Sequence, residues 1–309
     1  MTTDRSKTVL VAGGAGFIGS TLVAALLKRG LAVRILDNFI TGKREHCPAE
    51  AELVEADIRD LDAVRAAMRG VAYLFHAAAI PRVILSVEKP VETEFTNVIG
   101  TLNLLTAARD AGIKKFIFSG SSAVYGNQER LPVSEEMAPN PLSPYAVQKL
   151  TAEHYVRLFC RLYGLRTLTL RYFNVYGPRM PTEGAYASVI AVFLRQRREG
   201  RPLTIDGDGE QTRDFIYVDD VVRANLAAME SHLGDGRAFN VGLGSSVSVK
   251  RLAELFGGPV VHRPPRPGDA RNTQADLASI RSVLGWTPEV TLEEGLARLM
   301  AMHGVGRPG

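Results

Sequence analysis

Short apolar runs alternate with helix-like segments along the first half of the chain. The first run, 7–12, is rich in β-branched residues and ends in glycines, which is typical of a strand buried in a parallel sheet. Repeated strand and helix units predict an α/β fold with a doubly wound parallel sheet and right-handed crossovers. Further strands are expected at 32–36, 52–56, 72–75, 115–119 and 166–172, and helices at 61–68, 93–111 and 143–163.

This regular pattern loosens after residue 174. Proline and glycine cluster at 176–184 and 257–268, and the apolar runs become shorter. We therefore expect a first domain at 1–174 and a smaller, irregular domain at 175–309, some segments of which return to the first. In the second part, helices are expected at 185–199, 218–231, 248–256, 276–284 and 291–302, and short strands near 203–205, 238–241 and 259–262.

A glycine-rich turn joins the first predicted strand to a helix. Gly13, Gly16 and Gly19 form this turn, and Asp37 ends the next strand. Glycines let backbone N–H groups approach a pyrophosphate at a helix N-terminus, where the helix dipole favours anions. Asp37 can accept hydrogen bonds from the adenosine ribose and would repel a 2′-phosphate, which favours NAD over NADP. A tight turn followed by a capping aspartate is the alternative.

Other polar and small residues also follow predicted strands. In doubly wound sheets, ligands bind at the carboxyl ends of the strands, so these positions are candidates for a binding site. His76 is interpreted as structural, and the small residues after it would let a flat ligand lie close. The candidates at these ends are Asp57, Ala77, Ala78, Ala79, Ser121 and Asn174.

Tyr145 and Lys149 lie four residues apart on a helix predicted to begin after Ser143 and to end at Gly164. At this spacing the two side chains share one helix face. To act as a base near pH 7, a phenol must lose roughly three pKa units, or about 4 kcal/mol. An ammonium at ~4 Å, with an effective dielectric constant near 20, supplies about that much. Taken alone, the motif is also compatible with a solvated helix face.

Composition excludes several classes of protein. Of the 309 residues, 46% are apolar and 23% are charged, as in a globular domain, and the net charge is +4. The positive residues are scattered apart from 195–198, so nucleic-acid binding is not indicated. Cys47, Cys160 and the histidines show neither a disulfide framework nor metal-ligand spacing. The early glycines argue against a membrane segment at 8–27, and a cytoplasmic location is expected.

Together, the motifs resemble those of an extended short-chain dehydrogenase/reductase. More closely, the chain resembles the UDP-hexose 4-epimerases, especially the branch that acts on UDP-N-acetylglucosamine. The similarity runs from about residue 8 to residue 300, with the motifs in order. The motifs are Gly13-x-x-Gly16-x-x-Gly19, Tyr145-x-x-x-Lys149, Arg171-Tyr-Phe-Asn174-Val-Tyr-Gly-Pro-Arg179, Gly207-Asp-Gly-Glu-Gln-Thr-Arg213-Asp-Phe-Ile-Tyr-Val-Asp-Asp220 and Arg266-Pro-Gly-Asp269.

The resemblance implies a Rossmann-type sheet, NAD as the cofactor and a UDP-sugar as the substrate. Tyr145 would be the general base and acid at the sugar's carbon-4 hydroxyl, and Lys149 would lower its pKa and hold the nicotinamide ribose. Ser121 would hydrogen-bond the same hydroxyl, with Ser122 as the second choice. The implied cofactor contacts are Gly13, Gly16, Phe17, Ile18, Gly19, Asp37, Asn38, Asp57, Ile58, Ala77, Ala78, Ala79, Asn97, Tyr145 and Lys149.

The resemblance also assigns the substrate contacts. Arg213 and Arg266 would grip the diphosphate, although ion pairs with Asp214 or Asp269 are an alternative for them. Asp269 is itself a predicted substrate contact, and Asn174 would contact the diphosphate or the sugar. Thr273 would border the carbon-2 substituent, and its small size favours UDP-GlcNAc and UDP-GalNAc over UDP-Glc and UDP-Gal. A threonine that packs near a following helix is the alternative.

The implied reaction oxidises carbon 4 and returns the hydride to the opposite face of a transient 4-keto sugar. A 4,6-dehydratase would need an acid and a base beside Ser121, where Ser122 and Ala123 stand. A UDP-glucuronate epimerase or decarboxylase would need a site for the sugar carboxylate, and a non-catalytic dinucleotide sensor would typically lose Tyr145 or Lys149. The helices at 93–111 and 143–163 resemble those that pair in family dimers, so a homodimer is expected.

Overall fold

The computed structural model describes residues 8–182, 188–264 and 270–306. A seven-stranded sheet lies at its centre, and all neighbouring strands in it are parallel. Its strands are β1 (Thr8–Ala12), β2 (Val33–Asp37), β3 (Glu52–Glu55), β4 (Val71–His76), β5 (Lys115–Ser121), β6 (Thr167–Tyr172) and β11 (Asp235–Val241). Their spatial order, β11-β6-β5-β4-β1-β2-β3, reverses between β1 and β4. The predicted doubly wound, Rossmann-type sheet is confirmed, and ligands bind at such a reversal.

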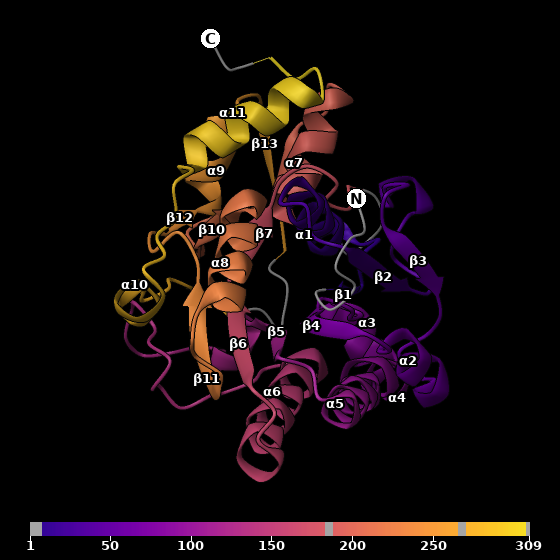
Figure 1. Ribbon diagram of the computed structural model, residues 1–309. Helices are drawn as coiled ribbons and strands as arrows, with labels where there is room; N and C mark the ends of the chain where they lie inside the picture. The colour runs from indigo at the N-terminus through magenta and orange to yellow at the C-terminus, as the bar shows by residue number, and fades with distance from the viewer. Residues whose placement is uncertain (1–7, 183–187, 265–269, 307–309) are drawn as a thin grey trace.

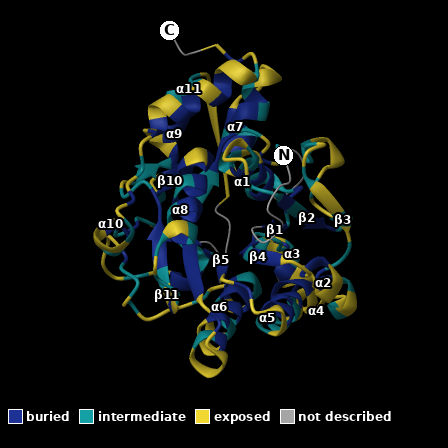
Figure 2. Cartoon of the chain, in the orientation of Figure 1, coloured by how far each residue is buried: buried dark blue, intermediate teal, exposed yellow. Residues whose placement is uncertain are grey.

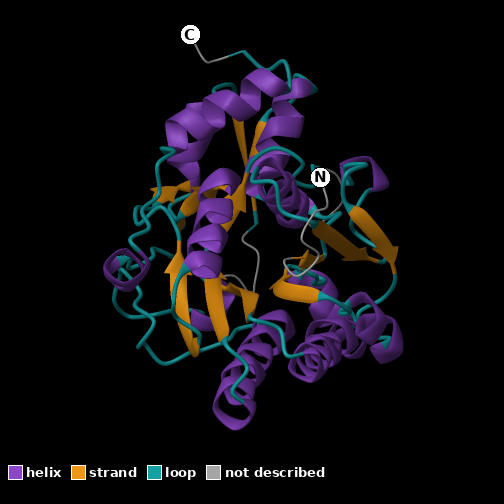
Figure 3. Cartoon of the chain, in the orientation of Figure 1, coloured by secondary structure: helices purple, strands orange, loops and turns teal. Residues whose placement is uncertain are grey.

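Helices cover both faces of this sheet (Figures 1 and 3). They are α1 (Phe17–Lys28) and α8 (Val218–Glu230) on one face, and α2 (Leu61–Ala67), α5 (Gly100–Ala111) and α6 (Pro144–Tyr163) on the other. Val9 and Val11 of β1 belong to the apolar core under α1 and α8, whereas Leu10 and Ala12 belong to the core under the other three helices. Because both faces are covered, the strands are mostly buried (Figure 2). This burial explains why they form continuous apolar runs in the sequence.

The helix predicted at 93–111 is built from three consecutive parts. They are α4 (Pro90–Glu94), the π-helical turn Phe95–Ile99 and α5. A further short helix, α3 (Val83–Glu88), precedes them and was not predicted from the sequence. It packs against α4 and α6, so it lies at the helix that carries Tyr145.

The segments after residue 174 build a second lobe and also complete the main sheet. In addition to β11 and α8, they form β7 (Asn174–Tyr176), β8 (Leu203–Asp206), β9 (Thr212–Arg213), β10 (Phe215–Tyr217), β12 (Val247–Ser248), β13 (Val260–Arg263), α7 (Val189–Arg198), α9 (Val249–Phe256), α10 (Ala278–Leu284) and α11 (Leu292–Met302). β7 pairs with β10 and β8 with β13, both in parallel, and β9 pairs with β12 in antiparallel fashion. An apolar cluster that includes Phe193, Phe215, Phe256 and Leu299 forms the core of this lobe.

The position of β11 bears on how the domains are divided. β11 comes from the second part of the sequence but pairs with β6 at the edge of the main sheet. The division at residue 174 therefore stays a prediction, with at least one later segment in the first domain. None of the helices within the described ranges is long and apolar enough to cross a membrane.

Candidate active site

Helix α6 begins and ends where its sequence predicts. The Ser143 side chain accepts a hydrogen bond from the backbone N–H of Ala146 at 3.2 Å, and Pro144 occupies the first helical position. At the other end, Gly164 takes up a left-handed conformation with φ of 67°. These caps place Tyr145 and Lys149 in the first two turns, at the edge of the sheet where the strands end.

Tyr145 meets Ser121, the last residue of β5. The Tyr145 backbone N–H donates to the Ser86 hydroxyl at 3.0 Å, so α3 helps to hold the start of α6. Burial raises the pKa of the Tyr145 phenol above its usual value, and a side-chain hydrogen bond with Ser121 opposes this shift. The Ser121 hydroxyl also accepts from the backbone N–H of Ala123 at 3.2 Å. Ser122 begins the 3₁₀ turn Ser122–Tyr125, and Ser121 is the serine whose hydrogen bond acts on Tyr145.

Lys149 is buried one helical turn after Tyr145, with 4% of its surface exposed. Its ammonium nitrogen lies 4.3 Å from the centre of the Phe118 ring. Burial lowers the pKa of Lys149 to about 7, and the nearby carboxylate of Glu153 opposes this shift. Burial and the hydrogen bond with Ser121 are the causes of the shift in the pKa of Tyr145. Lys149 is not among these causes, so its effect on the phenol stays a prediction.

A narrow crevice opens at the reversal between β1 and β4. It is lined by Gly13, Gly16, Leu36, Asp37, Asn38, Ile40, Thr41, Ala56, Ile58, Ala77, Ala78, Ala79, Ile80 and Thr96. A Cβ atom at Gly13, where φ is +80°, would lie 2.5 Å from the backbone nitrogen of Ala78. A Cβ atom at Gly19 would lie 2.0 Å from the Gly13 carbonyl oxygen. Only glycine fits at these two positions, so the turn can bring its backbone close to a ligand.

Asp37 and Asp57 contribute carboxylates at this end of the sheet. Asp37 accepts hydrogen bonds from the backbone N–H groups of Ala15 and Phe39, both at 2.9 Å. Asp57 accepts from the Asn38 amide at 2.8 Å and from the Arg59 guanidinium at 2.9 and 2.7 Å. Burial opposes ionisation of Asp57, but the hydrogen bonds from Arg59 and Asn38 outweigh it and lower its pKa to about 2. Both Asn38 and Asp57 are therefore held in fixed positions.

Three predicted cofactor contacts have other neighbours in the structure. Asn97 accepts from the Ile80 backbone N–H at 2.8 Å and donates to the Gln148 side chain at 2.8 Å, so its amide fixes the segment after the three alanines. Phe17 packs against the apolar cluster of the second lobe, and Ile18 packs against the core under α1 and α8. A direct contact of these side chains with NAD stays a prediction.

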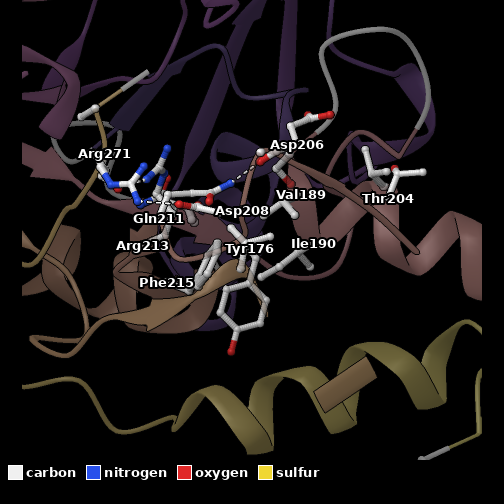
Figure 4. Close-up of a pocket in the computed structure, with 17 residues that line it drawn as sticks. Tyr176, Val189, Ile190, Thr204, Asp206, Asp208, Gln211, Arg213, Phe215 and Arg271 are labelled. Carbon is white, nitrogen blue, oxygen red and sulfur yellow. Dashed lines mark hydrogen bonds and ion pairs between the residues drawn. The ribbon is translucent and has the colours of Figure 1, made fainter. Parts of the chain in front are cut away.

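A larger cavity of about 640 Å³ lies in the second lobe (Figure 4). Two of the predicted substrate residues, Asn174 and Arg213, line it. Asp208 and Arg271 also line it and form an ion pair at 2.8 Å, and Gln211 donates to the Asp206 carbonyl at 2.8 Å. Asp208 and Gln211 belong to the sequence motif at 207–220, but no role was predicted for either of them. Arg271 lies in an irregular stretch without periodicity, so no sequence signal identified it.

Thr273 belongs to the segment that follows Arg271, and it lies beside Asn174 of β7. Its hydroxyl accepts from the Asp214 backbone N–H at 3.3 Å and from the Asn174 amide at 3.5 Å. The buried Asp214 carboxylate accepts from the backbone N–H groups of Leu243, Gly244 and Ala275 at 2.7 to 3.0 Å. These bonds hold the segment that carries Thr273 against β7 and β11. Arg266 and Asp269, two further predicted substrate residues, lie outside the described residues.

Comparison with known proteins identifies the family. The model of the NAD dependent epimerase/dehydratase family matches residues 9–242. The chain belongs to this family. Its cofactor is NAD, as the glycine turn and Asp37 predict. The predicted resemblance to the extended short-chain dehydrogenase/reductases is thereby confirmed at the level of the family.

Relatives match this family member over nearly its full length. The UDP-glucose 4-epimerase of Mycolicibacterium smegmatis is 41% identical over 302 residues, which cover 94% of this chain and 96% of that protein. The crystal structure of UDP-glucose 4-epimerase from Thermotoga maritima with UDP-glucose has a TM-score of 0.91 and 41% identity, covering 95% and 97% of the two chains. UDP-N-acetylglucosamine 4-epimerase from Methanobrevibacter ruminantium M1, in complex with UDP-N-acetylmuramic acid, has a TM-score of 0.91 and 37% identity, covering 96% and 97%.

Proposed function

We propose that this family member is a UDP-sugar 4-epimerase that interconverts UDP-GlcNAc and UDP-GalNAc, with UDP-Glc and UDP-Gal as poorer substrates. The observation that carries the proposal is the hydrogen-bonded pair of Tyr145 and Ser121. Ser121 ends β5 and Gly13 follows β1, so both lie at the carboxyl edge of one parallel sheet. A proton-transfer group and a dinucleotide turn at the same edge suit oxidation of a sugar hydroxyl.

The crevice at the β1–β4 reversal suits NAD. The Gly13–Gly19 turn would receive the pyrophosphate at the N-terminus of α1, and Asp37 would accept from the adenosine ribose. Asp57 and Ile58 would flank the adenine, and the alanines after His76 would lie along the dinucleotide. The remaining proposed contacts are Phe17, Ile18, Asn38, Asn97, Tyr145 and Lys149. Bound NAD would supply a hydride acceptor that later returns the hydride.

The proton steps fall to residues of the chain. Tyr145 would take the proton of the carbon-4 hydroxyl and return it at the end of the reaction, with Ser121 holding the same hydroxyl. A phenol with a raised pKa is a weak acid, so a positive charge must favour its ionised form. The Lys149 ammonium, on the same helix face, is the proposed source of that charge.

The cavity of the second lobe would hold the UDP portion. Arg213 lines it, and guanidinium groups pair well with phosphate oxygens. Asn174 would contact the diphosphate or the sugar, and Arg271 adds a second described guanidinium to the same cavity. Arg266 and Asp269 remain proposed contacts on the strength of their motif alone.

The proposal of an N-acetylated sugar rests on Thr273. Its position beside Asn174 supports a role at the sugar, and its small side chain would leave space at carbon 2. The Methanobrevibacter ruminantium relative is described as a UDP-N-acetylglucosamine 4-epimerase, whereas the other two are described as UDP-glucose 4-epimerases. Because the relatives include both kinds of epimerase, the preference for N-acetylated substrates is proposed from Thr273 and not from the relatives.

A homodimer and a cytoplasmic location are also proposed. A surface groove is lined by exposed apolar side chains of α4, the π-helical turn and α6, namely Val91, Phe95, Ile99 and Val147. Contiguous exposed apolar surface of this kind marks an interaction site, and a second copy of the chain could cover it. Light scattering at micromolar concentration tests this, because a monomer would contradict the dimer.

The activity is tested with purified protein and no added cofactor. UDP-GlcNAc, UDP-GalNAc, UDP-Glc and UDP-Gal are incubated separately, and the products are resolved by NMR. We expect interconversion within each pair, faster for the N-acetylated sugars, and a loss of about 10²–10⁴-fold in Tyr145→Phe. A 4-keto-6-deoxy product would instead identify a dehydratase. No conversion of any of the four sugars would contradict the proposal.

A further inference from the structure

A buried ion pair lies on α6 one helical turn after Lys149, between Glu153 of this helix and Arg171 of β6. Glu153 follows Lys149 by one turn, so Tyr145, Lys149 and Glu153 share one face of α6. Arg171 on β6 donates to both carboxylate oxygens of Glu153, from Nε at 2.9 Å and from Nη2 at 2.6 Å. The side chains of Arg171 and Glu153 are only 7% and 11% exposed. A bidentate pair of this kind fixes both partners in orientation as well as in distance.

The same guanidinium also holds the turn after the catalytic serine. Nη1 of Arg171 donates to the Tyr125 hydroxyl at 2.7 Å, and that hydroxyl donates to the Asn240 side chain at 2.7 Å. Tyr125 is the last residue of the 3₁₀ turn for which Ser121 is the cap. Arg171 therefore joins the helix that carries Tyr145 to the turn that carries Ser121.

Glu153 is also the carboxylate that acts on Lys149. Burial lowers the pKa of Lys149, and Glu153 raises it. From the other elements, Phe118 of β5 presents its ring face to the ammonium, and His76 of β4 lies near it. Burial, and then the charge of Lys149, lowers the pKa of His76 well below its usual value, so this imidazole is neutral near pH 7.

We propose that Glu153 and Arg171 are positioning residues for the reaction, in which Arg171 sets the approach of Ser121 to Tyr145 and Glu153 is the counter-charge of Lys149. Neither residue touches the reacting atoms. The inference rests on the proposed function, because it assumes that Tyr145 and Lys149 carry out the proton transfer. The inference gives the buried charges of Glu153 and Arg171 a role in the reaction, which the proposed function alone does not provide.

Glu153→Gln tests the counter-charge, because it keeps the shape of the side chain and removes its charge. The titration of Lys149 is followed by NMR on protein labelled with ¹³Cε-lysine and carrying its cofactor. We expect the midpoint to fall by about one pH unit, as for loss of a neighbouring opposite charge. The alkaline limb of the pH profile of kcat should move to lower pH by a similar amount, because Lys149 then loses its proton at a lower pH. If Glu153→Gln folds poorly, Glu153→Gln with Arg171→Gln avoids leaving the Arg171 charge buried without its partner. Because a positive charge is removed together with the negative one, the midpoint should still fall, but by less than in the single variant.

Tyr125→Phe tests the link to the serine turn while the ion pair stays intact. We expect kcat to fall about tenfold at every pH, because small misplacements of catalytic groups are costly, and the Lys149 titration to stay unchanged. An unshifted Lys149 titration in both Glu153 variants would overturn the counter-charge role. Wild-type kcat and KM in Tyr125→Phe would overturn the positioning role. Because the lysine titration needs no substrate, its outcome is separate from whether the proposed activity is found.

Discussion

The Ser86 hydroxyl accepts a hydrogen bond from the backbone N–H of Tyr145 at 3.0 Å, so a residue of α3 completes the capping of the helix that carries the phenol. Ser86 is fully buried, and its hydroxyl donates in turn to the Val83 carbonyl at 2.6 Å. We expect Ser86→Ala to lower the free energy of unfolding by about 1 kcal/mol, as for loss of a cap or a buried hydrogen bond. We also expect kcat to fall, because Tyr145 loses a direct contact. Urea denaturation and steady-state kinetics measure the two effects.

Ser143→Ala is the matched control for this variant. Ser143 caps the same helix, but it accepts from the N–H of Ala146 and not from that of Tyr145. Both variants should lose similar stability, whereas Ser86→Ala should lose more activity. Equal losses of kcat would show that only helix stability matters and that the contact with Tyr145 has no separate effect.

Asp37 should decide between the two dinucleotides. Its carboxylate ends β2 beside the glycine turn, where it would repel the 2′-phosphate of NADP. In Asp37→Asn, the amide oxygen can still accept from the Ala15 N–H, but the repulsion is lost. We expect the Asp37→Asn variant to bind NADPH at least about tenfold more tightly than the wild type does. The reason is that two like charges placed side by side cost more than about 1.4 kcal/mol. Fluorescence titration with NADH and NADPH measures this, with Asp60→Asn, at the start of α2, as the control. Unchanged discrimination would rule out a role for the Asp37 charge.

Lys149 should make the stability of the cofactor-stripped protein depend on pH. Its pKa is about 7 in the folded protein and near 10.5 in the unfolded chain. Between these values the unfolded chain binds more protons at this position, so its contribution to the free energy of unfolding rises with pH. From pH 7 to pH 9 the rise should be about 2 kcal/mol. Denaturation of the wild type and of Lys149→Met at both pH values isolates this term. The prediction would be contradicted if the free energies of unfolding of the wild type and of Lys149→Met differed by the same amount at pH 7 and at pH 9.

The parts of the fold that were predicted correctly depend on local sequence. Ser143 and Gly164 mark the ends of α6 because capping and the left-handed conformation are properties of one or two residues. Central strands such as β1 and β4 were found because burial on both faces leaves a continuous apolar run. By contrast, α3 has only six residues, too few for a helical period to show. Its residue Ser86 was missed with it, although it contacts Tyr145.

The missed relationships depend on contacts between distant segments. The sequence predicted that some later segments return to the first domain, but not that β11 pairs with β6, because no local pattern encodes that choice. The ion pair of Glu153 with Arg171 joins a helix to a strand, and that of Asp208 with Arg271 joins two segments that line the cavity of the second lobe. Sequence motifs identified individual candidates such as Tyr145 and Ser121. The resemblance already placed Ser121 and Tyr145 at one hydroxyl, whereas the contact of Ser86 with Tyr145 could be found only in the structure.

Thr273→Tyr should separate the two classes of substrate. The Thr273 hydroxyl lies within hydrogen-bond distance of the Asn174 amide, so a tyrosine would extend into the part of the cavity that Asn174 lines. We expect kcat/KM for UDP-GlcNAc to fall by about 10- to 100-fold, as 1–3 kcal/mol of overpacking predicts, and activity on UDP-Glc to be kept. Thr273→Val is the control, because it removes the hydroxyl with little change in volume. If Thr273→Val lost the N-acetylated substrates as well, the hydrogen bond to Asp214 and not the space at carbon 2 would set the preference. Equal losses for both sugars in Thr273→Tyr would show that residue 273 does not discriminate between them.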